Sequence, residues 1–187
     1  ATTDIYTLSL HDALPICDET AANNVTSNYG FTTYRAGILM ESFEGETFPP
    51  TGWAVVNNGD ENAWTRYTTG PRTGLACASI VYDADDAHDD WLITPKLVPT
   101  EGDATFSFWA KNGSTTYIDL FNVKLSITTN EVASFTNVLA SDVGPGTNYT
   151  QYTYDLSAYI GQNVYLAIQA TSVDELQIGR ASCRERV

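Results

Sequence analysis

Acidic residues gather in one stretch of the chain, and their carboxylates are the groups best suited to chemistry. They are Glu41, Glu44, Asp60, Glu61, Asp83, Asp85, Asp86, Asp89 and Asp90. Calcium takes about six to eight oxygen ligands, several of them carboxylates, usually from loops that wrap the ion. Glu44 follows one expected strand and Asp89–Asp90 precede another, so a sandwich could bring them together. The pattern predicts structural calcium near Glu41, Glu44, Asp89 and Asp90; the alternative is a set of solvated acidic loops.

The same carboxylates could act as a glycosidase pair, which needs two carboxyl groups about 5–10 Å apart across a cleft. Adjacent pairs such as Asp89–Asp90 are more typical of ion-binding loops. The sequence contains no GxSxG, HExxH or phosphate-binding glycine motif. Cys77 stands in a run of small residues and is expected to be buried, whereas a cysteine nucleophile would need a histidine such as His88. We therefore expect no enzymatic activity.

Aromatic residues supply the candidates for ligand contact. Tryptophans in strands are usually part of the core, although an exposed one can stack on a sugar ring. Trp64 is kept as a ligand-contact candidate, and Tyr82 and Tyr117 are the tyrosines that we expect to be exposed.

The charge balance narrows the range of partners. The chain has 187 residues and a formal net charge of −14. Nucleic acids and anionic membranes both attract basic surfaces, so we expect neither as a partner. No apolar run approaches the length that crosses a bilayer, so membrane insertion is not expected either.

Short alternating segments dominate the middle of the chain. The clearest are residues 105–110, 121–127 and 164–168, in which every second residue is apolar. Such alternation gives each strand one buried and one wet face. Further short strands are expected at 53–56, 63–67, 78–82, 91–94 and 149–156, with one helix-like piece at 132–139. Many short strands separated by Gly, Asn and Asp breaks predict an all-β sandwich or jelly roll.

Both ends of the chain resemble translated sequencing adapter. Residues 1–16 read ATTDIYTLSLHDALPI, one residue away from the translation of a short-read library adapter, and residues 178–187 read IGRASCRERV, from the reverse complement of part of it. We therefore expect residues 1–17 and 177–187 to be artefacts and set them aside. Residues 18–37, rich in Asn, Thr and Ala, are expected to be a linker or the tail of a preceding domain.

Six motifs in order carry a family resemblance. They are ESFEG at 41–45, FPPTGW at 48–53, NNGDENAW at 57–64, DDWLITPKL at 89–97 and YDLSAYIGQ at 154–162, with FSFWA at 106–110 before the last. This set resembles the cleaved-adhesin or choice-of-anchor J domain of Bacteroidetes-type surface proteins, over residues 38–176. The resemblance implies a jelly-roll sandwich, of the galactose-binding-like or MAM-like kind, with bound calcium. The loop around Asp60 is similar to an Asp/Gly-rich loop of the family, so Asp60 is a candidate ligand of a second calcium, although the loop has few of the family's carboxylates and solvated residues are the favoured interpretation there.

The family normally ends with a strand carrying an Ile-Asp-Asp-Val-like motif, whereas this chain runs from Asp174-Glu175-Leu176 into the adapter-like tail. We therefore expect the last strand to be missing. The first functional hypothesis is a non-catalytic, calcium-stabilised adhesion module of a secreted or cell-surface bacterial protein, holding a host protein, a glycan or a neighbouring domain. The second is an architectural spacer that binds only calcium, and the third is a fragment of a secreted glycoside hydrolase.

Overall fold

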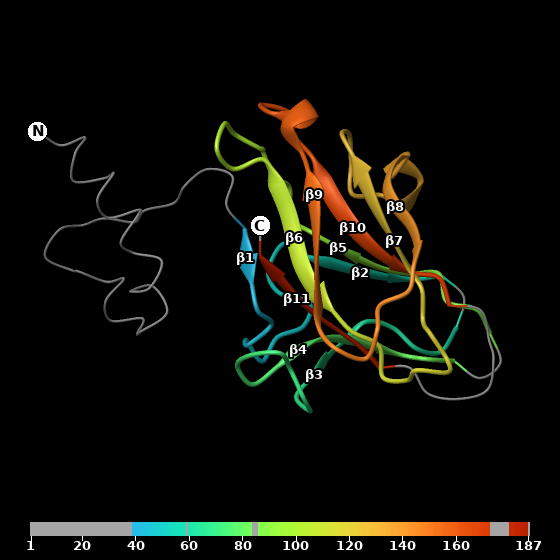
Figure 1. The fold of residues 1–187 in the computed structure, drawn as a ribbon. Coiled ribbons are helices and arrows are strands. Elements are labelled where there is room, and N and C mark those ends of the chain that lie inside the picture. The colour runs from blue at the N-terminus through green and yellow to red at the C-terminus, as the bar shows by residue number, and fades with distance from the viewer. Residues whose placement is uncertain (1–38, 59, 84–85, 173–179, 187) are drawn as a thin grey trace, which may run out of the picture. The chain divides into compact units, whose positions relative to one another are not determined.

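Two antiparallel sheets form the described part of the chain (Figure 1). The computed structural model describes residues 39–58, 60–83 and 86–172, and the backbone of residues 180–186. Expectations for residues 1–37 and 177–179, and the carboxylate of Asp85, lie outside these ranges.

The first sheet has the strand order β2-β5-β10-β7-β8. Its strands are β2 (Ala54–Asn57), β5 (Asp90–Ile93), β10 (Tyr165–Ala170), β7 (Phe121–Ser126) and β8 (Asn137–Val143). The second sheet has the order β3-β4-β11-β6-β9, with β1 paired to β11. Its strands are β1 (Met40–Glu41), β3 (Thr65–Tyr67), β4 (Cys77–Val81), β6 (Thr105–Ala110), β9 (Thr150–Asp155) and β11 (Arg180–Arg186).

The core lies between the two sheets because alternate residues of each strand point inward. Phe106 and Phe108 of β6 and Val123 and Leu125 of β7 are fully buried in the same apolar cluster. Their neighbours along the strands, such as Lys124, face the other way, as the period of two requires. The expected all-β sandwich is thereby confirmed.

The first sheet also carries apolar residues on its outer face. Trp91, Ile93 and Ala167 form a second buried cluster with Phe135, which follows the short 3₁₀ turn η1 (Val132–Ser134). The ring centroids of Trp91 and Phe135 lie 5.6 Å apart. Because Phe135 covers this outer face, β5 is buried on both faces. The start of β5 belongs to the site described below.

The position between β4 and β6 is occupied by the backbone of β11, which pairs with Val81–Ala78 on one side and Trp109–Ser107 on the other. The sequence predicts that the last strand is missing, whereas in this structure residues 180–186 pair with the edge of β4 and with the edge of β6. Backbone pairing does not depend on side-chain identity, so two open sheet edges accept an extended segment that can reach them.

Helical structure among the described residues amounts to two 3₁₀ turns, η1 and η2 (Ser157–Tyr159). Neither has the length or the apolar character that a bilayer-crossing helix requires.

Candidate metal centre

Several strand ends meet at one end of the sandwich. The ladder aligns Asn57 at the end of β2 with Asp90 at the start of β5, Asp90 with Ala170 at the end of β10, and Ala170 with Phe121 at the start of β7. The connecting segments are therefore neighbours: the N–H of His88 donates to the carbonyl of Ser172 (3.0 Å). We call the described residues of segments 58–62, 82–89, 111–120 and 171–172 the loop end.

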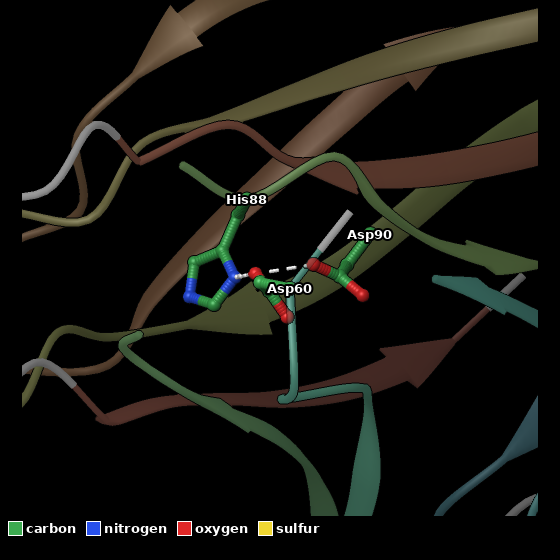
Figure 2. Close-up of side chains that lie close together, drawn as sticks. All are labelled: Asp60, His88 and Asp90. Carbon is green, nitrogen blue, oxygen red and sulfur yellow. Dashed lines mark hydrogen bonds and ion pairs between the residues drawn. The ribbon is translucent and has the colours of Figure 1, made fainter. Parts of the chain in front are cut away.

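Asp60 and His88 of the loop end lie together with Asp90 at the start of β5 (Figure 2). Nδ1 of His88 faces both carboxylates: it lies 3.1 Å from Oδ2 of Asp90 and contacts Oδ2 of Asp60. One potential ligand atom from each residue falls within 4.8 Å of the other two. The side chains are almost completely buried, with exposed fractions of 2% for His88 and 0% for both aspartates.

The surrounding backbone holds the two aspartates in place. Oδ1 of Asp60 accepts the N–H of Asn62 (2.7 Å), and the amide of Asn57 donates to the carbonyl of Asp60 (2.9 Å). Asp90 is the first residue of β5, and its carbonyl accepts the indole N–H of Trp64 (3.1 Å). The positions of both carboxylates therefore follow from strand register and a turn, and not from their mutual contact.

The electrostatics of the cluster reflect two negative groups in a buried place. Burial on its own would lower the pKa of His88, but the hydrogen bonds and charges of Asp90 and Asp60 outweigh it and raise the pKa. Burial and the nearby Asp60 raise the pKa of Asp90, against the opposing effect of His88. Burial also raises the pKa of Asp119, and the hydrogen bond from the hydroxyl of Ser172 and the charge of His88 partly offset this rise.

Two polar atoms of the cluster have no hydrogen-bond partner although they are buried. They are Nε2 of His88 and Oδ1 of Asp90. Buried polar atoms are usually paired, since leaving one without a partner costs about 1–3 kcal/mol.

The donor set does not fit the calcium ion that the family resemblance implies. Calcium takes about six to eight oxygen ligands. Here an imidazole nitrogen faces the two buried carboxylates, and imidazole is a ligand of zinc, copper, iron and nickel. The carboxylate of Asp89, which the sequence also predicts as a calcium ligand, accepts hydrogen bonds from Trp91 (2.7 Å), Gln169 (2.6 Å) and Asn58 (3.1 Å).

The other two expected metal ligands lie elsewhere. Oε1 of Glu41 accepts the N–H groups of Ser42 and Phe43 (2.9 and 2.5 Å). Oε2 of Glu44 accepts the N–H of Leu75 (2.9 Å), which lies just before β4. Asp83 follows the other end of β4, and its Oδ2 accepts a hydrogen bond from the side-chain amide of Asn62 in the loop end (2.9 Å). The length of β4, about 13 Å for five residues, thus separates Glu44 from the loop end, and the structure does not bring it to Asp89 and Asp90.

Glu44 instead packs on Gly74, which has a φ of +69° and would place a Cβ 1.8 Å from Oε1 of Glu44. Replacing Gly74 with Ala is expected to cost about 2 kcal/mol of unfolding free energy, from the left-handed backbone and the displaced Glu44 hydrogen bond. Gly70 is a matched control with a φ of +70° and open space around it, so G70A should cost only about 1 kcal/mol. Urea unfolding measures both, and equal costs would mean that the Glu44 contact constrains nothing.

The predicted ligand-contact residues fall into two groups. Trp64 is 4% exposed and donates to the backbone of Asp90, so it belongs to the core and offers no surface. Tyr82 is partly exposed, and Tyr117 is 38% exposed beside Ile118, which is 50% exposed. Both tyrosines lie in the loop end.

Sequence reasoning missed His88 as a site residue. It considers His88 only as the partner of a cysteine nucleophile, whereas the structure places it between two of the predicted metal ligands, Asp60 and Asp90. Its position two residues before Asp90 was the available signal, because residues i and i+2 of an extended segment point to the same side.

Comparisons with known proteins identify the family of the chain. A family model described as the cleaved adhesin domain matches residues 36–171. Hemagglutinin A of Porphyromonas gingivalis is 33% identical over 165 residues, a match that covers 72% of this chain and 8% of that protein. The chain thus spans less than a tenth of the length of that relative.

Solved structures agree on the fold. A cleaved adhesin domain of Lys-gingipain from Porphyromonas gingivalis matches with a TM-score of 0.62 at 23% identity, covering 81% of this chain and 96% of that one. A structure of carbohydrate-binding modules from the β-sandwich superfamily matches with a TM-score of 0.55 at 15% identity, covering 82% of this chain and 64% of that one. On the family model and the hemagglutinin match, the chain belongs to the cleaved adhesin domain family.

Proposed function

We propose that this chain is a non-catalytic adhesion module of a larger secreted or cell-surface bacterial protein, and that it binds a glycan through the loop end. The observation that carries the proposal is the exposed pair Tyr117 and Ile118, in a fold shared with carbohydrate-binding modules. Exposed apolar side chains next to each other mark interaction sites, and tyrosine is enriched among residues that dominate binding energy.

The buried position of the ionisable cluster supports a role in binding over one in hydrolysis. A glycosidase needs its two carboxyl groups on either side of the scissile bond, open to substrate. The carboxylates of Asp60 and Asp90 are both 0% exposed. The name of the hemagglutinin relative supports an adhesive role.

The chain offers a matched pair of surface variants for the test. Ile118 in the loop end and Ile160, after η2 at the opposite end of β10, are exposed to a similar extent (50% and 41%). Binding of the whole chain to an array of defined glycans and to intact erythrocytes is the measurement. Y117A and I118S are each expected to weaken binding about tenfold, and I160S is expected to leave it unchanged.

Other results would redirect the proposal. Binding to erythrocytes that survives removal of their surface glycans would favour a host protein as the ligand. A wild-type chain that binds neither probe would favour the architectural spacer, and equal losses in I118S and I160S would contradict a binding site at the loop end.

A further inference from the structure

We propose that Asp60, His88 and Asp90 form a structural site for a first-row transition-metal dication, with zinc as its resident ion. Two independent observations point there: three ligating side chains gathered in one buried place, and a buried carboxylate oxygen, Oδ1 of Asp90, without a partner. The role is structural and lies beyond the proposed adhesive function.

One of the two ligand contacts of His88 already has the spacing that such an ion requires, and the other, to Asp60, must widen to admit it. A zinc ion with bonds of about 2.0–2.1 Å holds neighbouring ligand atoms about 3.0–3.5 Å apart. Nδ1 of His88 and Oδ2 of Asp90 are 3.1 Å apart, and all three ligand atoms fit within 4.8 Å. Figure 2 shows the ring of His88 turned so that this nitrogen faces both carboxylates.

The charge of the cluster favours a cation of high charge. Two carboxylates in contact and shielded from water repel each other strongly unless a positive group lies between them. A dication neutralises both, while Nδ1 of a neutral imidazole supplies a third bond. Nitrogen and carboxylate oxygen together are a zinc-type donor set, whereas calcium prefers oxygen alone.

Neighbouring hydrogen bonds hold the backbone of His88 and Asp90 and one carboxylate oxygen of Asp60 in place, whereas Nε2 of His88 has no partner. The N–H of Asn62 fixes the oxygen of Asp60 that does not face His88 (2.7 Å). The N–H of His88 is tied to Ser172 (3.0 Å), and the carbonyl of Asp90 to the indole of Trp64 (3.1 Å). A hydrogen bond to a ligating carboxylate, such as that of Asn62 to Asp60, orients the ligand. An ion at this place would join the turn at Asp60 to the start of β5.

Cobalt and zinc titrations of the whole chain test the proposal, in a C17S/C183S background that removes the two terminal thiols. We expect one Co²⁺ per chain, with visible absorption bands of nitrogen and oxygen ligation, and displacement of the cobalt by Zn²⁺. At free zinc about 100 times its Kd, the Tm should rise by about 5–10 °C. Calcium at the same concentration should leave the Tm unchanged.

The sequence provides its own control, since it contains two histidines, His11 and His88. H88Q should abolish the cobalt bands and the zinc-dependent rise in Tm, and H11Q should keep both. Should H88Q fail to fold, the imidazole nitrogen signals of the wild-type chain report ligation directly by NMR. Zinc binding that survives H88Q, a Tm that responds to calcium but not to zinc, or a wild-type chain that binds no metal and holds a protonated His88 would each overturn the proposal.

Discussion

Replacing Phe108 with Ala is expected to lower the free energy of unfolding by about 3–5 kcal/mol, enough to abolish cooperative unfolding in a marginally stable domain. Phe108 is 0% exposed and lies on β6, facing the first sheet. Its ring centroid is 5.5 Å from those of Phe106 and Phe121 and 5.7 Å from that of Tyr152. The substitution thus removes the centre of an aromatic cluster that joins the two sheets.

A cavity already present beside Phe108 places the cost at the upper end of that range. An apolar cavity of about 20 Å³ is lined by Phe108 together with Trp64, Ile80, Phe121 and Ile168. Truncation would enlarge this space, and the cost of such a substitution grows with the cavity that remains. Urea unfolding followed by tryptophan fluorescence measures the loss. V138A, at a residue 56% exposed, is the control and should change stability by less than about 0.5 kcal/mol.

The strands that sequence reasoning predicted best are those with strict alternation. The structure gives β6 the predicted bounds of 105–110, because aromatic and small residues alternate there and one face must be buried. In contrast, β8 spans residues that were partly expected to be helical. Its sequence NVLASDV does not alternate, and a register shift opposite Phe121–Lys124 interrupts its pairing. Within the sheet, β8 lies at the edge and pairs with β7 alone.

For the site, the sequence identifies some of the residues but not which of them come together. Asp60 and Asp90 could be named from their type and position, but their proximity depends on the pairing of Asn57 with Asp90, which no local pattern specifies. Glu44 was grouped with Asp89 and Asp90 because each flanks a strand, yet flanking a strand does not say at which end of the sandwich a residue lies. For Trp64, the type suggested a surface ligand contact, whereas its indole N–H is bound to the backbone of Asp90 inside the core (3.1 Å).

Replacing His88 with Leu in the presence of a chelator is expected to lower the free energy of unfolding by about 3–5 kcal/mol at neutral pH. The apolar side chain leaves Asp60 and Asp90 buried against each other with no positive group between them. D60N in the same background should recover part of the loss, since it removes one of the two charges. The double-mutant cycle should therefore show a coupling of more than about 1 kcal/mol, and strictly additive costs would contradict the cluster.

The pH dependence of H88L provides a second readout of the same cluster. Burial and the nearby Asp60 raise the pKa of Asp90 in the folded chain. A carboxyl group whose pKa is raised on folding binds its proton more tightly when folded, so protonation stabilises the fold and deprotonation destabilises it. H88L should thus gain stability relative to H11L, the matched control, as the pH falls from 7 toward the raised pKa of Asp90. Without the imidazole that faces both aspartates, only a proton or a metal ion can offset the two buried carboxylates.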